Sequence, residues 1–162
     1  MFIRFDFIDK KELIGIRRSM SLVNDNTYSL FHQFMKLLIS IGKKDCLKYD
    51  VRMFPEAYSG NAESTFIKWA AIDPENDMKF PDEFEKLPLI EGKYAVFLHQ
   101  GSAVEAFRTF QYIFNCWFPE SGTEPDQRLH FDVLPPEYKY DDPKGQHEIW
   151  IPVRDKHPSI IP

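Results

Sequence analysis

Two stretches of this chain look like copies of each other, and they constrain the fold more than any other feature. In Tyr49–Trp69 and in His130–Val153, a short apolar segment leads into Pro-Glu, a polar loop with glycine follows, and an alternating strand carries a tryptophan. This agreement predicts a tandem duplication of a unit of about 80 residues, which is too long for a solenoid repeat. The matching landmarks share one offset of 81 positions: Pro55 with Pro136, and Trp69 with Trp150.

The repeat predicts one pseudo-two-fold domain of the α+β class over residues 1–153. Copy one spans about 2–72 and copy two about 87–153, and an acidic segment with two prolines, 73–86, links them. Each copy is expected to fold as strand, helix, strand and strand. Two main helices would then pack on an antiparallel sheet around a central ligand cleft. Residues 154–162 are predicted to form a loose tail.

Apolar periodicity assigns the elements within each copy. Strands are predicted at 2–8, 13–21, 49–55, 66–72, 92–99, 128–134 and 148–153, with a short apolar segment at 87–90. The first helix follows the possible N-caps of residues 24–27 and ends at Gly42, with an apolar stripe of Leu30, Phe34, Leu37, Leu38 and Ile41. The second helix starts at a capping box, Ser102 to Glu105, and carries Phe107, Phe110, Phe114 and Trp117.

Composition excludes several classes of function. The net charge of −5 and the absence of a basic stripe argue against direct nucleic-acid binding. Cys46 and Cys116 form no disulfide framework or zinc pattern, and the five histidines show no metal-ligand spacing, so neither a metal nor a cofactor is expected. No signal peptide and no run of about 18 apolar residues occur, which predicts a soluble cytoplasmic protein that does not enter membranes.

The last predicted strand places a carboxylate beside an indole. Because side chains alternate along a strand, Glu148 and Trp150 face the same way. The repeat puts Trp69 on the equivalent strand, with an isoleucine where the acid would be. A carboxylate near two indoles suits a lipophilic cation, since each ring adds roughly 0.5–2 kcal/mol of attraction. The alternative is that Glu148 lies at an exposed sheet edge or pairs with Arg128 or His147.

Four segments in order give the chain a family resemblance. They are similar to the second half of the GyrI-like small-molecule-binding domains, which are the effector-binding domains of multidrug-responsive transcription regulators and their free-standing relatives. The match covers most of residues 87–153, and copy one resembles the first half of the family more weakly. The segments are 92–101, 117–122, 130–136 and 148–153.

The resemblance implies a cleft that takes aromatic or amphipathic, often cationic, compounds beside an acid. Glu148 is the expected polar anchor in the last strand, and aromatic rings are the expected walls. The predicted ligand-binding residues are Glu148, Trp150, Trp69, Trp117, Tyr94, Phe97 and Tyr112.

The sequence begins directly with the first strand, which leaves no residues for an N-terminal helix-turn-helix. The resulting expectation is a stand-alone drug-binding protein. One alternative is a hydrolase of reactive electrophilic toxins, in which Glu148 activates water or protonates a leaving group. Another is a protein that docks on a partner such as gyrase, or on a second copy of itself.

Overall fold

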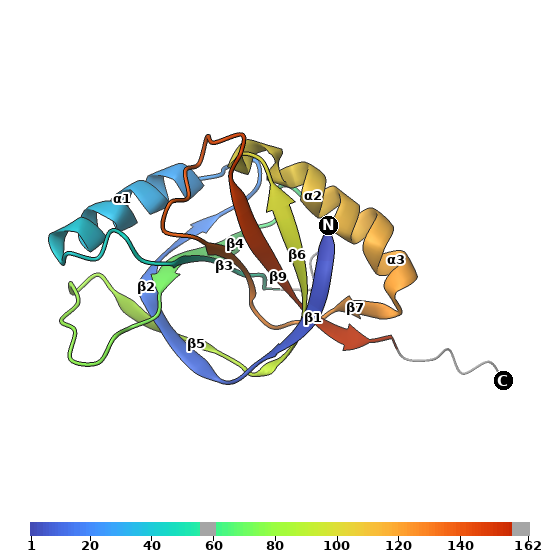
Figure 1. Cartoon of the computed structure of the whole chain (residues 1–162), viewed down its shortest axis with the longest axis horizontal. Helices are drawn as coiled ribbons and strands as arrows, with labels where there is room; N and C mark the ends of the chain where they lie inside the picture. Colours follow the sequence, from blue (N-terminus) through green and yellow to red (C-terminus); the bar gives the residue numbers. More distant parts are fainter. Residues whose placement is uncertain (56–60, 157–162) are drawn as a thin grey trace.

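The computed structural model describes residues 1–55 and 61–156, which form a curved antiparallel sheet with its main helices on one face (Figure 1). The strands are β1 (Phe2–Ile8), β2 (Lys11–Met20), β3 (Lys48–Met53), β4 (Phe66–Ile72), β5 (Glu85–Leu89), β6 (Gly92–Gln100), β7 (Thr123–Pro125), β8 (His130–Leu134) and β9 (Gln146–Asp155). The helical segments are α1 (Thr27–Ser40), η1 (Ala103–Glu105), α2 (Ala106–Tyr112), η2 (Ile113–Trp117) and α3 (Phe118–Ser121). The predicted α+β class is confirmed.

The order of strands in the sheet is β1-β6-β9-β8-β3-β4-β2-β5, with β7 added beside β9. β3 and β8 lie at the centre, and each predicted copy contributes its strands to one side of them. The exception was not foreseen: β1 pairs with β6 of copy two, while β5 pairs with β2 of copy one. This order is compatible with two related halves that exchange their first strands. Descent from a duplication, and the division into copies, stay predictions.

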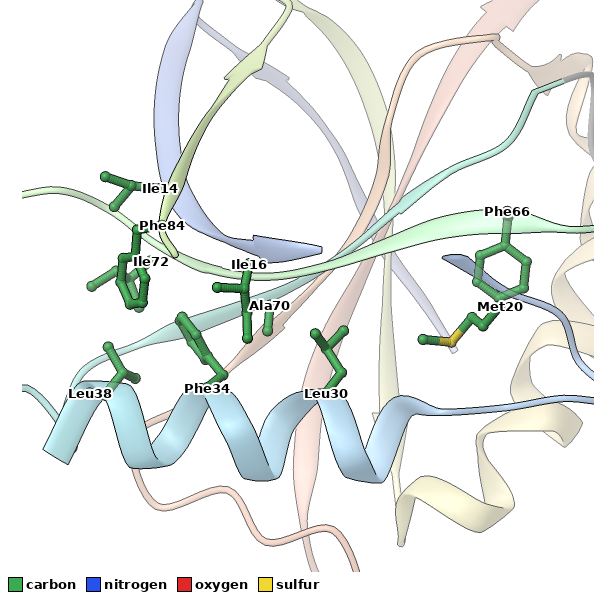
Figure 2. Packing of buried hydrophobic residues seen from close by; sticks show 10 residues of the cluster. All are labelled: Ile14, Ile16, Met20, Leu30, Phe34, Leu38, Phe66, Ala70, Ile72 and Phe84. Carbon is green, nitrogen blue, oxygen red and sulfur yellow. The ribbon is translucent and has the colours of Figure 1, made fainter. Parts of the chain in front are cut away.

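Helix α1 packs on the sheet through the predicted stripe. Leu30, Phe34 and Leu38 are fully buried against residues of β2 and β4 (Figure 2). The helix ends near Gly42, whose φ of 72° lies in the left-handed region that glycine adopts without strain. The predicted linker, 73–86, contributes to the core, because Phe84 is buried in this cluster and Phe80 packs against it, and β5 begins within it at Glu85.

The second helical region runs from η1 to α3. It starts at the predicted capping box, where the Ser102 backbone N–H donates to Glu105 Oε2 at 3.1 Å. A π-helical turn, η2, re-aims the side chains that follow it, and Ile113 and Phe118 are buried against β6 and β9. Phe107, which lies in α2 before this turn, is 54% exposed.

Two strands of copy two, β6 and β9, run slightly beyond their predicted ends, whereas β8 begins at His130, two residues after its predicted start. β9 continues to Asp155, so the first residues of the predicted tail belong to the sheet. The short strand β7 was not predicted, because three residues give no periodic signal. No helix in residues 1–55 and 61–156 combines the length and the apolar character needed to cross a membrane.

Candidate functional site

A cleft of about 770 Å³ opens between α1 and α2, above the central strands β3 and β8. Its walls are aromatic, and they come from elements that are far apart in the sequence. The Phe and Tyr rings that line it are Tyr28 and Phe31 of α1, Phe54 after β3, Phe66 of β4, Phe107 and Phe110 of α2, Phe114 of η2, and Tyr138 and Tyr140 of the loop between β8 and β9. The predicted cleft between helices and sheet is thus present.

The mouth of the cleft exposes apolar side chains to solvent. Tyr28 is 67% exposed, Val104 64% and Phe107 54%. The rings of Tyr28 and Tyr140 meet edge to face across the mouth, with centroids 6.2 Å apart. Exposed rings grouped around a hollow favour a ligand that covers them, because covering apolar surface releases the water that it orders.

The floor of the cleft is charged, although its side chains are buried. Alternate residues of β3 and β8 point into it, so Lys48, Asp50 and Arg52 face the cleft, and Tyr49 and Val51 face the other side of the sheet. Asp50 lies directly opposite Asp132 in the pairing of β3 with β8. Two carboxylates in this position repel each other unless cations lie between them.

Arg52 and Lys68 supply those cations. Arg52 donates to Asp132 Oδ1 at 2.7 Å and to Asp50 Oδ1 at 3.4 Å, and its guanidinium lies 5.2 Å from the centre of the Phe110 ring. Lys68 Nζ lies 3.2 Å from Asp50 Oδ2 and donates to Thr27 Oγ1 at 2.8 Å. The floor is therefore a compact array of alternating charge.

Burial and charge shift the pKa values of this array. Burial alone would raise the pKa of Asp132, but the charge of Arg52 and the contact with His147 outweigh it and hold that pKa below its usual range. Burial, followed by the charge of Arg52, lowers the pKa of His130 to about 3. His130 is therefore neutral at physiological pH, and Asp132 is ionised.

His147 joins the floor from β9. Its Nε2 lies 3.3 Å from Asp132 Oδ2, its ring packs edge to face against Tyr138, and neither ring nitrogen has a hydrogen bond of good geometry. The side chain is 3% exposed, so it is a buried polar group that faces the cavity without a full set of partners.

None of the seven predicted ligand-binding residues lines this cleft. For Glu148 and Trp150 the reason is that side chains alternate along β9: His147 points into the cleft, so these two point to the opposite face of the sheet. There Glu148 accepts two hydrogen bonds from Arg4, at 3.1 and 3.2 Å, and one from the Trp150 indole at 2.9 Å. The pairing with Arg128 or His147 that was considered for it does not occur. A ligand role for this group stays a prediction.

The other predicted residues are mostly packing residues. Trp69 and Tyr94 belong to the apolar cluster on the face opposite the cleft, where burial raises the pKa of Tyr94 to about 12. Phe97 and Trp117 pack with each other and with Phe2 under the second helical region. Tyr112 is 44% exposed and lies outside the cleft.

The residues of the charged floor were missed by the sequence reasoning. A signal was present, because Lys48, Asp50 and Arg52 alternate with apolar residues in a segment that was interpreted only as short and apolar. His130 and Asp132 repeat the pattern on β8. Among the described residues, no group of three or more His, Cys, Asp or Glu side chains could hold a metal ion.

The geometry defines a class of protein: an α+β domain with an open aromatic cleft over a charged sheet. The model of the GyrI-like small molecule binding domain matches residues 1–154, so the chain belongs to the GyrI-like family. The resemblance inferred from the sequence is confirmed.

Individual relatives are distant. The chain is 26% identical over 98 residues to the transcriptional regulator BrlR of Pseudomonas aeruginosa, covering 60% of this chain and about a third of BrlR (36%). The structure of SAV2435 bound to tetraphenylphosphonium is similar with a TM-score of 0.68 at 13% identity, over 95% of this chain and 94% of that one. A hydrolase encoded by lin2189 from Listeria innocua is similar with a TM-score of 0.56 at 10% identity, over 93% and 91% of the two chains. At such identities the structural likeness concerns the fold alone.

Proposed function

We propose that this chain is a small-molecule-binding protein that takes a lipophilic aromatic compound in the cleft between α1 and α2. The observation that carries the proposal is the combination of a cavity of about 770 Å³ with exposed rings at its mouth and buried polar groups at its base. Ligand pockets usually have this size, with mainly apolar walls and a few polar groups that orient the ligand.

The family and one relative support this function. GyrI-like domains are described as small-molecule-binding domains, and SAV2435 was solved with tetraphenylphosphonium, an aromatic ion. The narrower hypothesis of a cation held by Glu148 has less support. Its carboxylate already accepts hydrogen bonds from Arg4 and Trp150, so a cation would have to displace Arg4 first.

Hydrolysis is a weaker candidate than binding. The predicted catalytic use of Glu148 requires a carboxylate that can reach a substrate in the cleft, and this carboxylate lies on the opposite face of the sheet. We therefore favour a binding protein over an enzyme. Docking on a protein partner such as gyrase stays an untested alternative.

A neutral fluorescent probe, N-phenyl-1-naphthylamine, tests the proposal without any contribution from ligand charge. We expect Phe107→Ala to weaken its binding about 2- to 10-fold, because one aromatic contact contributes roughly 0.5–1.5 kcal/mol. Fluorescence titration measures the dissociation constant. The matched control is Phe7→Ala, which removes a 60% exposed ring on β1, away from the cleft. Equal affinities of both variants and the wild type would contradict binding in the cleft.

A further inference from the structure

Within the part of the chain that the structure describes, most carboxylate oxygens in the floor of the cleft are paired with cations. Asp50 and Asp132 present four carboxylate oxygens. Arg52 donates to one oxygen of each residue, and Lys68 lies 3.2 Å from the second oxygen of Asp50. The second oxygen of Asp132 lies 3.3 Å from His147 Nε2, a contact that is not a hydrogen bond of good geometry. Asp50 and Asp132 are each paired with at least one cation, so neither is a free counter-ion for a ligand.

The donor groups of the same floor are not all engaged. A guanidinium has five N–H donors, and Arg52 uses two in the contacts described. An ammonium group has three, and Lys68 uses two, on Asp50 and Thr27. Lys48 also uses two, on the carbonyl oxygens of Lys44 and Cys46. The floor therefore has unused hydrogen-bond donors beside the open volume.

The charges that form the floor, counting the partly buried Lys68, are also unequal. Three cations, Lys48, Arg52 and Lys68, face the cleft beside two buried carboxylates. A further carboxylate, Asp25, lines the mouth, but it is exposed to water and accepts hydrogen bonds from Thr27. Each of these cations has hydrogen-bond partners, but their excess over the carboxylates makes the potential at the base of the apolar cavity positive, which favours a negative group there.

We propose that the natural ligand of the cleft is an organic anion: an aromatic body with a carboxylate or similar acidic group that accepts hydrogen bonds from Lys68 and Arg52. The rings of the mouth would cover the aromatic body, and the acidic group would reach the floor. The proposal rests on binding in this cleft. It deepens that function by naming the charge of the ligand, which is opposite to the cation expected from the sequence.

Two ions of equal shape and opposite charge test the proposal. Tetraphenylborate and tetraphenylphosphonium both place four phenyl rings around one central atom and have no hydrogen-bonding group, so they test the sign of the ligand charge that the floor prefers and not the hydrogen bonds themselves. We expect isothermal titration calorimetry of the whole chain to show tetraphenylborate binding at least 10-fold more tightly. Lys68→Met should reduce this preference about 10-fold, and Lys68→Arg should retain it. Differences in the hydration of the two ions cancel when the ratio of affinities of a variant is divided by that of the wild type, so the change caused by Lys68→Met is the decisive result.

The control is Lys86→Met, which removes a lysine whose side chain is 75% exposed and which lies outside the cleft. The ratio of its affinities for tetraphenylborate and tetraphenylphosphonium should equal that of the wild type. If Lys68→Met does not fold, Lys48→Met makes the same measurement, because it removes another cation of the floor. Equal affinity for both ions, or tighter binding of tetraphenylphosphonium, would overturn the anion proposal and leave binding in the cleft intact. Binding of neither ion would overturn the anion proposal, whereas N-phenyl-1-naphthylamine decides separately whether the cleft binds a ligand.

Discussion

Two arginines on opposite faces of the sheet have the same kinds of partner, two carboxylates and an aromatic ring, but they differ in how far they are buried. Arg52 contacts Asp50 two residues away and Asp132 on the neighbouring strand, and it faces the Phe110 ring at 5.2 Å. Arg4 contacts Asp6 two residues away and Glu148 of β9, and it faces the Trp150 ring at 5.3 Å. Each guanidinium therefore lies between two carboxylates and over an aromatic ring.

The two groups differ in burial. The Arg52 side chain is 9% exposed and the Arg4 side chain 39%. Water screens a half-exposed ion pair and lets either partner be solvated alone, whereas the partners of a buried pair become unpaired charges when one is removed. Similar geometry should therefore give unequal energetics, and the following substitutions measure the difference.

Arg52→Met should have the largest effect. It leaves Asp50 and Asp132 buried opposite each other, and losing one partner of a buried ion pair costs about 3–5 kcal/mol of folding free energy. Urea denaturation monitored by circular dichroism gives this value. A loss below about 1 kcal/mol would mean that water solvates the two carboxylates, and that removing Arg52 costs no more stability than removing Arg4.

Lowering the pH should reduce the free energy of unfolding through protonation of His130, which lies on the cleft face of the sheet. Its pKa is about 3 in the folded protein and about 6.5 in the unfolded chain, so between these values the unfolded chain binds a proton that the folded protein does not. Stability falls as the pH drops through this window. The wild type should lose about 2 kcal/mol more than His130→Phe between pH 7 and pH 5. Urea titrations of both proteins at each pH measure this difference, and parallel losses would refute it.

Arg4→Met should have the smallest effect, at most about 1 kcal/mol, because both partners are partly exposed. Thermal unfolding of this variant can be compared with that of Arg17→Met. Arg17 is an exposed arginine paired with Glu85 at 2.9 Å, and it lies over the Trp69 ring. The two variants should lose similar stability. A loss from Arg4→Met as large as that from Arg52→Met would show that β1 depends on this ion pair.

Local pattern was sufficient to predict most of the elements of this fold. The stripe of α1 and the capping box at Ser102 each depend on residues within one or two turns, so the sequence displays them directly. The partner of an edge strand depends on residues far along the chain. For this reason the pairing of β1 with β6 could not be predicted from periodicity.

The site was harder to predict than the fold. Alternation along β9 shows that His147 and Glu148 face opposite ways, but it does not show which of them faces the helices. The position of α1 and α2 decides that, and it is a property of the tertiary structure. The choice of Glu148 followed from the chemistry of an acid beside an indole, and that chemistry is present, with Arg4 in the place of the expected cation.

The exchange of first strands has a consequence for folding. Phe2 pairs with Phe97 and Leu13 with Leu87, so neither edge strand, β1 or β5, can pair with its neighbour until more than half of the chain has been synthesised. Topologies dominated by such distant pairings fold slowly, since a long loop must close before its contacts form. During translation on the ribosome, β2 and β3 would therefore have unpaired backbone groups until β5 and β8 are synthesised. Such unpaired strands can pair with other chains, so rapid synthesis of the remaining strands would reduce aggregation of the nascent chain.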